Sequence, residues 1–96
     1  MIRHATDFRI KHPVGSSAEG DFIAAIRGLK AISGVEKFEV ACQVSQKSEF
    51  TFGVSMEFKD QAAYEVAAVQ PDHLARVTSR WIPEVAAFTQ IDTLAL

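Results

Sequence analysis

The stretch FTFGVSMEF, residues 50–58, alternates apolar side chains with small or polar ones along its whole length. Successive side chains of a β-strand point to opposite faces, so this alternation predicts a strand with one buried face. The buried face comprises Phe50, Phe52, Val54, Met56 and Phe58, and the opposite face Thr51, Gly53, Ser55 and Glu57. The stretch therefore indicates a sheet that other elements cover on one side.

Two further segments show the same alternation and predict two more strands. Residues 2–11 carry an apolar face made of Ile2, His4, Thr6, Phe8 and Ile10. Residues 35–45 carry one made of Phe38, Val40, Cys42 and Val44. Because only the polar residues 45–48 separate this segment from the strand at 50–58, the two strands are expected to form a hairpin. On this face Cys42 is expected to be a small buried hydrophobe.

A helix is predicted between the first two strands. Ser16 and Glu19 form a capping box, in which each satisfies free backbone N–H groups at a helix start. Apolar residues at helical spacing follow through residues 17–33. Gly34 can adopt the left-handed conformation that ends a helix.

The second half of the chain repeats the helix and strand. Asp60 can cap a short helix, Pro71 restarts a helical segment, and Pro83 kinks or ends it. Residues 86–94 then form the last strand. This order predicts a ferredoxin-like α+β fold, a four-stranded antiparallel sheet with helices on one face, in a single domain over residues 1–96.

Composition excludes several functions. Ten basic and twelve acidic residues give a formal net charge of -2, and the basic residues are scattered, so nucleic acid is not an expected partner. The aromatic residues of the strand at 50–58 share a face that helices must cover, which argues against an RNA-binding sheet. No apolar run approaches the length of a membrane span, and the single cysteine with the polar N-terminal segment favours the cytoplasm.

Two histidines are candidates for chemistry. His73 lies near a helix start, where the neutral ring is favoured and can accept a proton; the alternative is that it hydrogen-bonds a neighbour and anchors the helix. His4 is expected to point between sheet and helices, either as a satisfied core residue or toward a ligand. If both line one open cavity, an enzyme is favoured. His12 is expected to be a solvated loop residue.

A ligand pocket is a second hypothesis. Alanines on the helices leave room beside the aromatic residues, so a flat apolar ligand could bind there, although the same residues can simply pack as core. The residues expected to line such a pocket are Phe8, Phe22, Ile26, Val54, Met56, Ala67 and Trp81. The histidines and Cys42 lack the spacing of metal ligands, so neither a metal nor another cofactor is expected.

Four segments in register resemble the stress-responsive A/B barrel (Dabb) family. These are MIRHATDFRIK (1–11), GVEKFEV (34–40), FGVSMEF (52–58) before a helix, and QPDH (70–73) with the downstream RWIPEV (80–85) and Asp92. The resemblance implies a homodimer in which two ferredoxin-like sheets pack face to face as a dimeric α/β barrel.

One branch of that family, the plant polyketide cyclases, uses a histidine of an HPxH motif and a tyrosine. His73 and His4 match two histidines of that branch, but Gln70, Ala67 and Phe52 replace other expected residues, and Tyr64 lies one turn before the tyrosine position. Three functions follow: a stress-associated domain binding a small apolar or aromatic molecule, a cyclase-like enzyme with His73 as acid and base, or a cofactor-free monooxygenase.

Overall fold

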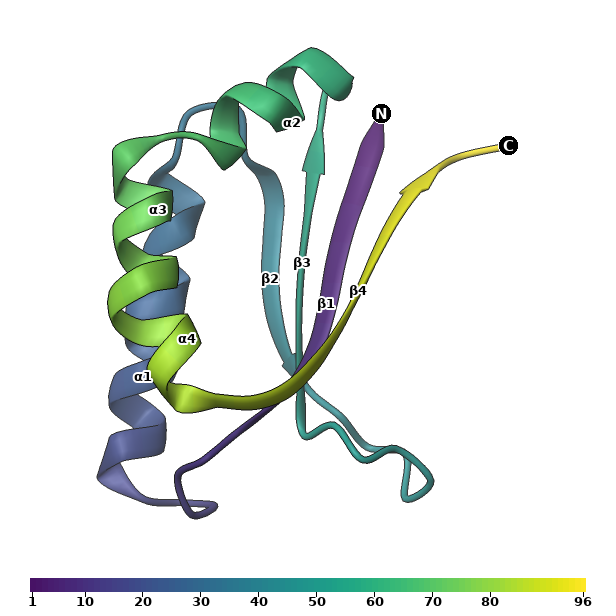
Figure 1. Ribbon diagram of the computed structural model, residues 1–96. Helices are drawn as coiled ribbons and strands as arrows, with labels where there is room; N and C mark the ends of the chain where they lie inside the picture. The colour runs from purple at the N-terminus through teal and green to yellow at the C-terminus, as the bar shows by residue number, and fades with distance from the viewer.

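The structure, a computed structural model, describes residues 1–96 as one sheet with helices on one face (Figure 1). The strands lie in the order β2-β3-β1-β4 and all neighbours are antiparallel. Their bounds are β1 (Ile2–Ile10), β2 (Glu36–Cys42), β3 (Phe52–Phe58) and β4 (Val85–Leu94). The other face of the sheet is uncovered (Figure 1). This arrangement is the predicted ferredoxin-like fold.

The helical layer comes from both halves of the chain. After β1 it contains α1 (Ser17–Arg27) and the 3₁₀ turn η1 (Gly28–Ala31). After β3 it contains α2 (Gln61–Ala68), α3 (Pro71–Arg76), the π-helical turn η2 (Val77–Trp81) and α4 (Ile82–Glu84). None of these helices is both long enough and apolar enough to cross a bilayer.

The predicted caps begin α1 and α2. The Ser16 hydroxyl accepts from the Glu19 backbone N–H at 3.2 Å, and the Glu19 carboxylate accepts from the Gly15 N–H at 3.3 Å. The Asp60 carboxylate accepts from the Ala63 N–H at 2.9 Å. α1 is shorter than predicted because the chain tightens into η1, and Gly34 then takes a φ of 90°.

The core lies between the two central strands and α1. Phe8 and Val54 are buried at 0% and 5% exposure, and the half-buried Val40 packs against the same cluster. Phe22 and Ile26 fill this core from α1. The predicted phases of all three alternating segments are therefore confirmed.

The hairpin differs from its prediction at both ends. β2 stops at Cys42, which is exposed, so its expected burial is wrong; Val44 beyond it is also exposed. β2 is an edge strand, and its end leads into the 43–51 connection, where no helix covers it (Figure 1). At its other end the pairing with β3 shifts between Glu36 and Glu39, and Lys37 has a φ of 49°.

The turn η2 widens the helix just before Pro83. The Ile82 N–H donates to the Val77 carbonyl, a five-residue spacing in place of the usual four. Proline has no N–H to continue the helical ladder, and a wide turn before it is one local adjustment to that loss. Trp81 lies in this turn and packs against Phe8, with their ring centroids 4.9 Å apart.

Candidate functional site

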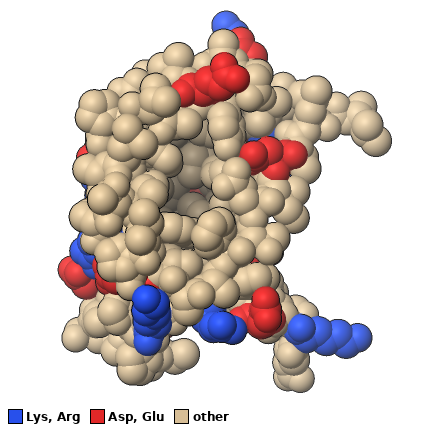
Figure 2. All heavy atoms as spheres, in the orientation of Figure 1, with Lys and Arg blue, Asp and Glu red and all other residues tan.

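A cavity of about 400 Å³ lies between the inner face of the sheet and the helical layer. Figure 2 shows it as a hollow in the middle of the molecule, bordered mainly by uncharged residues. Its wall is mostly apolar and includes Ile26, Leu29, Val54, Met56, Phe58 and Trp81. Its volume lies in the range typical of small-molecule sites.

A polar cluster of four side chains adjoins this cavity. His4 on β1 is paired directly with Asp92 on β4, and Gln90 stands two residues earlier on the same face. His4 Nδ1 lies 2.5 Å from Asp92 Oδ1. Because a carboxylate can only accept, Nδ1 carries the proton of this contact, and in the neutral form of the ring Nε2 would be the acceptor.

Tyr64 completes this cluster from α2. Its hydroxyl donates to Asp92 Oδ2 at 3.3 Å, and its ring meets the His4 ring edge to face with centroids 5.4 Å apart. Gln90 Nε2 donates both to the Tyr64 hydroxyl at 3.3 Å and to Asp92 Oδ2 at 3.1 Å. His4, Tyr64, Gln90 and Asp92 are together called the cavity cluster below.

Protonation in the cavity cluster follows from burial and hydrogen bonding. Burial raises the pKa of Tyr64, and the nearby Asp92 charge raises it further, so the phenol keeps its proton. Burial also pushes the pKa of Asp92 upward, but hydrogen bonds from His4 and Gln90 outweigh it and lower the pKa overall. Asp92 is therefore an ionised acceptor surrounded by donors.

His73 reaches the same cavity from α3. Its Nδ1 lies 3.0 Å from the Ala68 carbonyl oxygen, to which it donates, so Nε2 of the neutral ring is the acceptor here as well. This bond ties the first turn of α3 to the last residue of α2. The hydrogen bond fits the anchoring alternative, and the position of His73 in the same cavity lining as His4 meets the condition under which an enzyme is favoured.

The predicted ligand-binding residues separate into two groups. Ile26, Val54, Met56, Ala67 and Trp81 line the cavity. Phe8 and Phe22 do not: both are fully buried, with ring centroids 6.0 Å apart, and they support Trp81 from behind.

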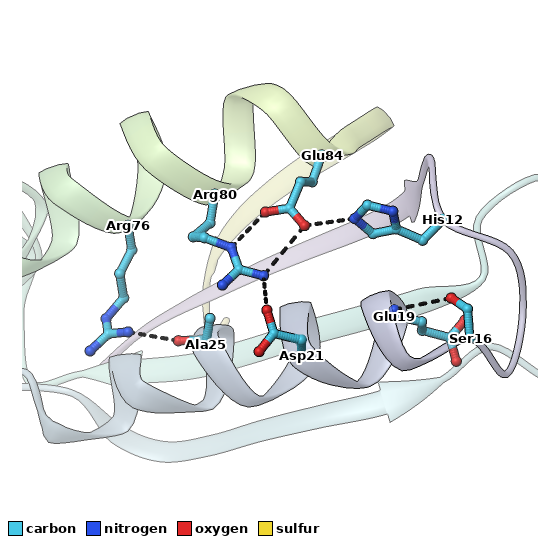
Figure 3. A network of polar contacts seen from close by, with 8 residues as sticks. All are labelled: His12, Ser16, Glu19, Asp21, Ala25, Arg76, Arg80 and Glu84. Carbon is cyan, nitrogen blue, oxygen red and sulfur yellow. Dashed lines mark hydrogen bonds and ion pairs between the residues drawn. The ribbon is translucent and has the colours of Figure 1, made fainter.

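His12 is not the solvated loop residue that the sequence suggests. Its Nε2 lies 2.6 Å from Glu84 Oε1, and the side chain is half-buried. Glu84 also accepts from Arg80 Nε at 2.5 Å, and Arg80 Nη2 donates to Asp21 on α1 at 2.8 Å (Figure 3). These four residues, His12, Asp21, Arg80 and Glu84, are called the outer cluster; they join α1, η2, α4 and the end of β1.

Sequence reasoning did not assign the partners of His4. In the sequence Asp92 belongs only to the family resemblance, Tyr64 lies one turn before the expected tyrosine position, and Gln90 carries no signal of its own. The usable signal was the alternation in residues 86–94, which puts Phe88, Gln90 and Asp92 on one face. Pairing Asp92 with His4 also requires the strand register.

No three His, Cys, Asp or Glu side chains of the chain lie close enough together to hold a metal ion. The cavity cluster offers one imidazole and one carboxylate, and both are already hydrogen-bonded to each other.

Fold and site together define a ferredoxin-like domain with a mainly apolar cavity beside an imidazole–carboxylate–phenol cluster. The chain belongs to the Dabb family, the stress responsive A/B barrel domain, whose family model matches residues 2–94. This match confirms the resemblance found in the sequence.

Solved structures agree with this assignment. A Dabb family protein with a ferredoxin-like fold from Mesorhizobium loti is 47% identical, with a TM-score of 0.95 and coverage of 99% of this chain and 96% of that one. A dimeric ferredoxin-like protein of unknown function from Thermobifida fusca is 20% identical, with a TM-score of 0.80 and coverage of 98% and 90%.

A hydroxynitrile lyase from Passiflora edulis is 15% identical, with a TM-score of 0.85 and coverage of 99% and 93%, which shows a shared fold alone. Among curated proteins, none matches this sequence.

Proposed function

We propose that this Dabb domain binds one small, predominantly apolar or aromatic molecule between its sheet and its helices. The carrying observation is the cavity of about 400 Å³, whose wall is mainly apolar and whose polar groups are few and placed on different elements. Apolar surface supplies affinity in such a site, and a few fixed polar groups set the orientation of the ligand.

The same proposal includes a homodimer that uses the uncovered face of the sheet. This face carries small side chains, including Ala5, Ala41, Gly53 and Ser55, that allow a second sheet to approach closely. Ile91 is 53% exposed on the same face. Several proteins that share the fold, including the one from Thermobifida fusca, are described as dimeric. A mass near 21 kDa by light scattering is expected, twice the 10.5 kDa of the chain.

Binding can be measured without a label, because the single tryptophan of the chain, Trp81, lines the cavity. Titration with naphthalene derivatives should change its fluorescence in a saturable way. Ala68→Leu, which extends a side chain into the cavity, should weaken binding at least about tenfold. Ala62→Leu on the exposed side of α2 is the matched control and should bind like wild type. Equal binding by both variants would contradict the cavity as the site.

An acid–base enzyme of the cyclase type is the second candidate. The observation that favours it is that His4 and His73 line one cavity and each donates through Nδ1, which leaves two acceptor Nε2 atoms at the site. His73 would take a proton from a carbon next to a ketone, and the resulting carbanion would attack a second carbonyl carbon of the same molecule. The cavity cluster would orient the carbonyl groups.

Heptane-2,4,6-trione tests this candidate, because closure of its C1–C6 bond with loss of one water gives orcinol. An enzyme should form orcinol faster than buffer does. His73→Gln should abolish the difference while the unfolding temperature stays close to that of wild type. Orcinol formation at the buffer rate, with the trione bound, would contradict cyclase chemistry and leave the binding role in place.

The cytoplasm is the proposed location. Cys42 is exposed and has no partner thiol in the chain, a state that a reducing compartment preserves. Fractionation of cells that express the tagged protein would test this proposal.

A further inference from the structure

The cavity contains one permanently charged side chain, and it is positive. No Asp, Glu or Lys lines the cavity, and Arg76 is its only arginine. Asp92, the one carboxylate of the cavity cluster, is hydrogen-bonded to the other three members and is not part of the lining. The lining of this largely apolar cavity therefore includes a single permanently charged side chain.

The guanidinium of Arg76 is held in place against α1. Nη1 donates to the Ala25 carbonyl oxygen at 2.9 Å, across the gap between α3 and α1 (Figure 3). Nε donates to the Asp72 carboxylate at 3.3 Å, one turn earlier on α3. The side chain is 29% exposed, so its position is defined by these partners while part of it stays accessible.

Gly28 makes this position available. A Cβ atom at residue 28 would lie 2.6 to 2.8 Å from Cζ, Nη1 and Nη2 of Arg76, which is closer than atoms can approach. The backbone at Gly28 has a φ of -62° and a ψ of -19°, which any residue adopts. The glycine at residue 28 is therefore not required by the backbone conformation. Its lack of a side chain instead leaves room for the guanidinium of Arg76.

The arginine retains unused donors. A guanidinium has five N–H groups, and its hydrogen bonds to Ala25 and Asp72 use two of them. Nη2 has no hydrogen-bond partner within the protein, and because no buried polar side-chain atom lacks one, Nη2 is accessible. If Arg76 served only to cap the end of α1 through the Ala25 carbonyl, a single N–H would suffice.

We propose that the cavity ligand is a carboxylate, a flat aromatic or alkyl acid whose carboxylate pairs with the guanidinium of Arg76 and whose apolar body lies against Val54, Met56 and Trp81. The planar fork of arginine matches the two oxygens of a carboxylate, and such bidentate bonds are among the strongest in proteins. This inference rests on the proposed binding function and names the chemical class of its ligand.

Two probes of the same shape separate the inference from the binding function. 2-Naphthoate carries the charge, and its methyl ester keeps the aromatic body without it. By Trp81 fluorescence, the wild-type protein should bind the acid at least about tenfold more tightly than the ester, as a charged hydrogen bond predicts. Equal affinities would overturn the carboxylate inference and leave the cavity function intact. Failure of both probes to bind would overturn both.

Arg76 variants assign the preference to its source. Arg76→Gln should lose the preference for the acid and leave ester affinity within about twofold, and Arg76→Lys should keep part of it. Arg27→Gln, at an exposed arginine outside the cavity, is the control and should keep the full preference. A preference that survives in Arg76→Gln would overturn the assignment.

Gly28→Ala tests the position of the guanidinium without removing it. The added methyl group must displace the guanidinium, so the preference for the acid should fall severalfold, whereas helix propensity favours alanine and the fold should persist. An unchanged preference in a folded Gly28→Ala protein would show that carboxylate binding does not need the guanidinium beside Gly28, and would count against the proposal.

Discussion

The outer cluster and the cavity cluster each contain a histidine that donates to a carboxylate, but the two carboxylates are neutralised differently. Glu84 in the outer cluster accepts from the guanidinium of Arg80, a permanent cation. Asp92 in the cavity cluster accepts from Tyr64 and Gln90, which are neutral donors, and from His4. The difference indicates that the outer cluster fastens helices together, whereas the cavity cluster holds His4, Tyr64 and Gln90 in place around Asp92 at the wall of the cavity.

The location of each cluster agrees with this distinction. The outer cluster joins α1 to η2 and α4 on the outside of the helical layer (Figure 3). The cavity cluster joins β1, β4 and α2, and three of its members line the cavity: His4, Tyr64 and Gln90.

Glu84→Gln should lower the free energy of unfolding by about 2 kcal/mol, because a half-buried Arg80 and His12 lose the charge that pairs them. Urea unfolding followed by circular dichroism measures this effect. Asp92→Asn is the matched change in the cavity cluster and should cost less than half as much. A larger loss for Asp92→Asn would reverse the comparison.

The loss of folding stability at acid pH should come mainly from Glu84. The hydrogen bond from Arg80 lowers the pKa of Glu84 in the folded protein despite the opposing effect of burial. A carboxyl with a lowered folded pKa stabilises the protein above its unfolded pKa of about 4.3, and this contribution disappears as the pH falls through the folded pKa. Thermal unfolding at pH 7 and pH 3 should therefore differ less for Glu84→Gln than for wild type.

The folded pKa of Asp92 is also lowered, but its partners Tyr64 and Gln90 are neutral whereas Glu84 pairs with the permanent charge of Arg80, so Asp92→Asn should flatten the pH profile less than Glu84→Gln does. If the two variants flatten the pH profile equally, the arginine pairing does not distinguish the clusters.

Arg80→Lys should cost about 1 kcal/mol of unfolding free energy. Lysine keeps the charge but cannot donate at once to both Glu84 oxygens and to Asp21 with a planar fork. The measurement is again urea unfolding, and ligand affinity should stay within about twofold. No change in stability would mean that charge alone, and not the geometry of the fork, fastens the helices.

Tyr64→Phe should have the smallest effect on stability, about 0.5 to 1 kcal/mol, since two long hydrogen bonds of the hydroxyl, to Asp92 and from Gln90, are lost and the ring remains. Burial and Asp92 raise the pKa of Tyr64, so the wild-type phenol should resist ionisation in an alkaline absorbance titration. Ligand affinity should change more than stability does, which is the reverse of the Arg80→Lys result.

The fold could be predicted from alternation and caps because both act locally. Ser16, Asp60 and the alternation around Val54 are each readable without knowing the rest of the chain. The predicted burial of Cys42 is wrong because alternation along a strand shows which face a side chain is on, but not how far the helices extend along that strand. At the edge strand β2 a side chain can therefore lie on the inner face of the sheet and still be exposed.

The site could be predicted only in part. His4 and His73 were identified by residue type and position, but the partners of His4 depend on the β1–β4 register and on where α2 ends, both set by tertiary packing. Arg76 gave no sequence signal at all. Its role arises from contacts with Ala25 and Gly28, which lie about fifty residues away in the chain.

Nuclear Overhauser contacts between bound 2-naphthoate and protein methyl groups would show whether the ligand lies in the cavity between sheet and helices. Ligand protons should give contacts to methyl groups of Ile26, Val54 and Met56, which face the cavity from α1 and β3. Contacts confined to Ile91 on the uncovered face of the sheet would show that the ligand binds outside the cavity and would contradict the proposed binding site.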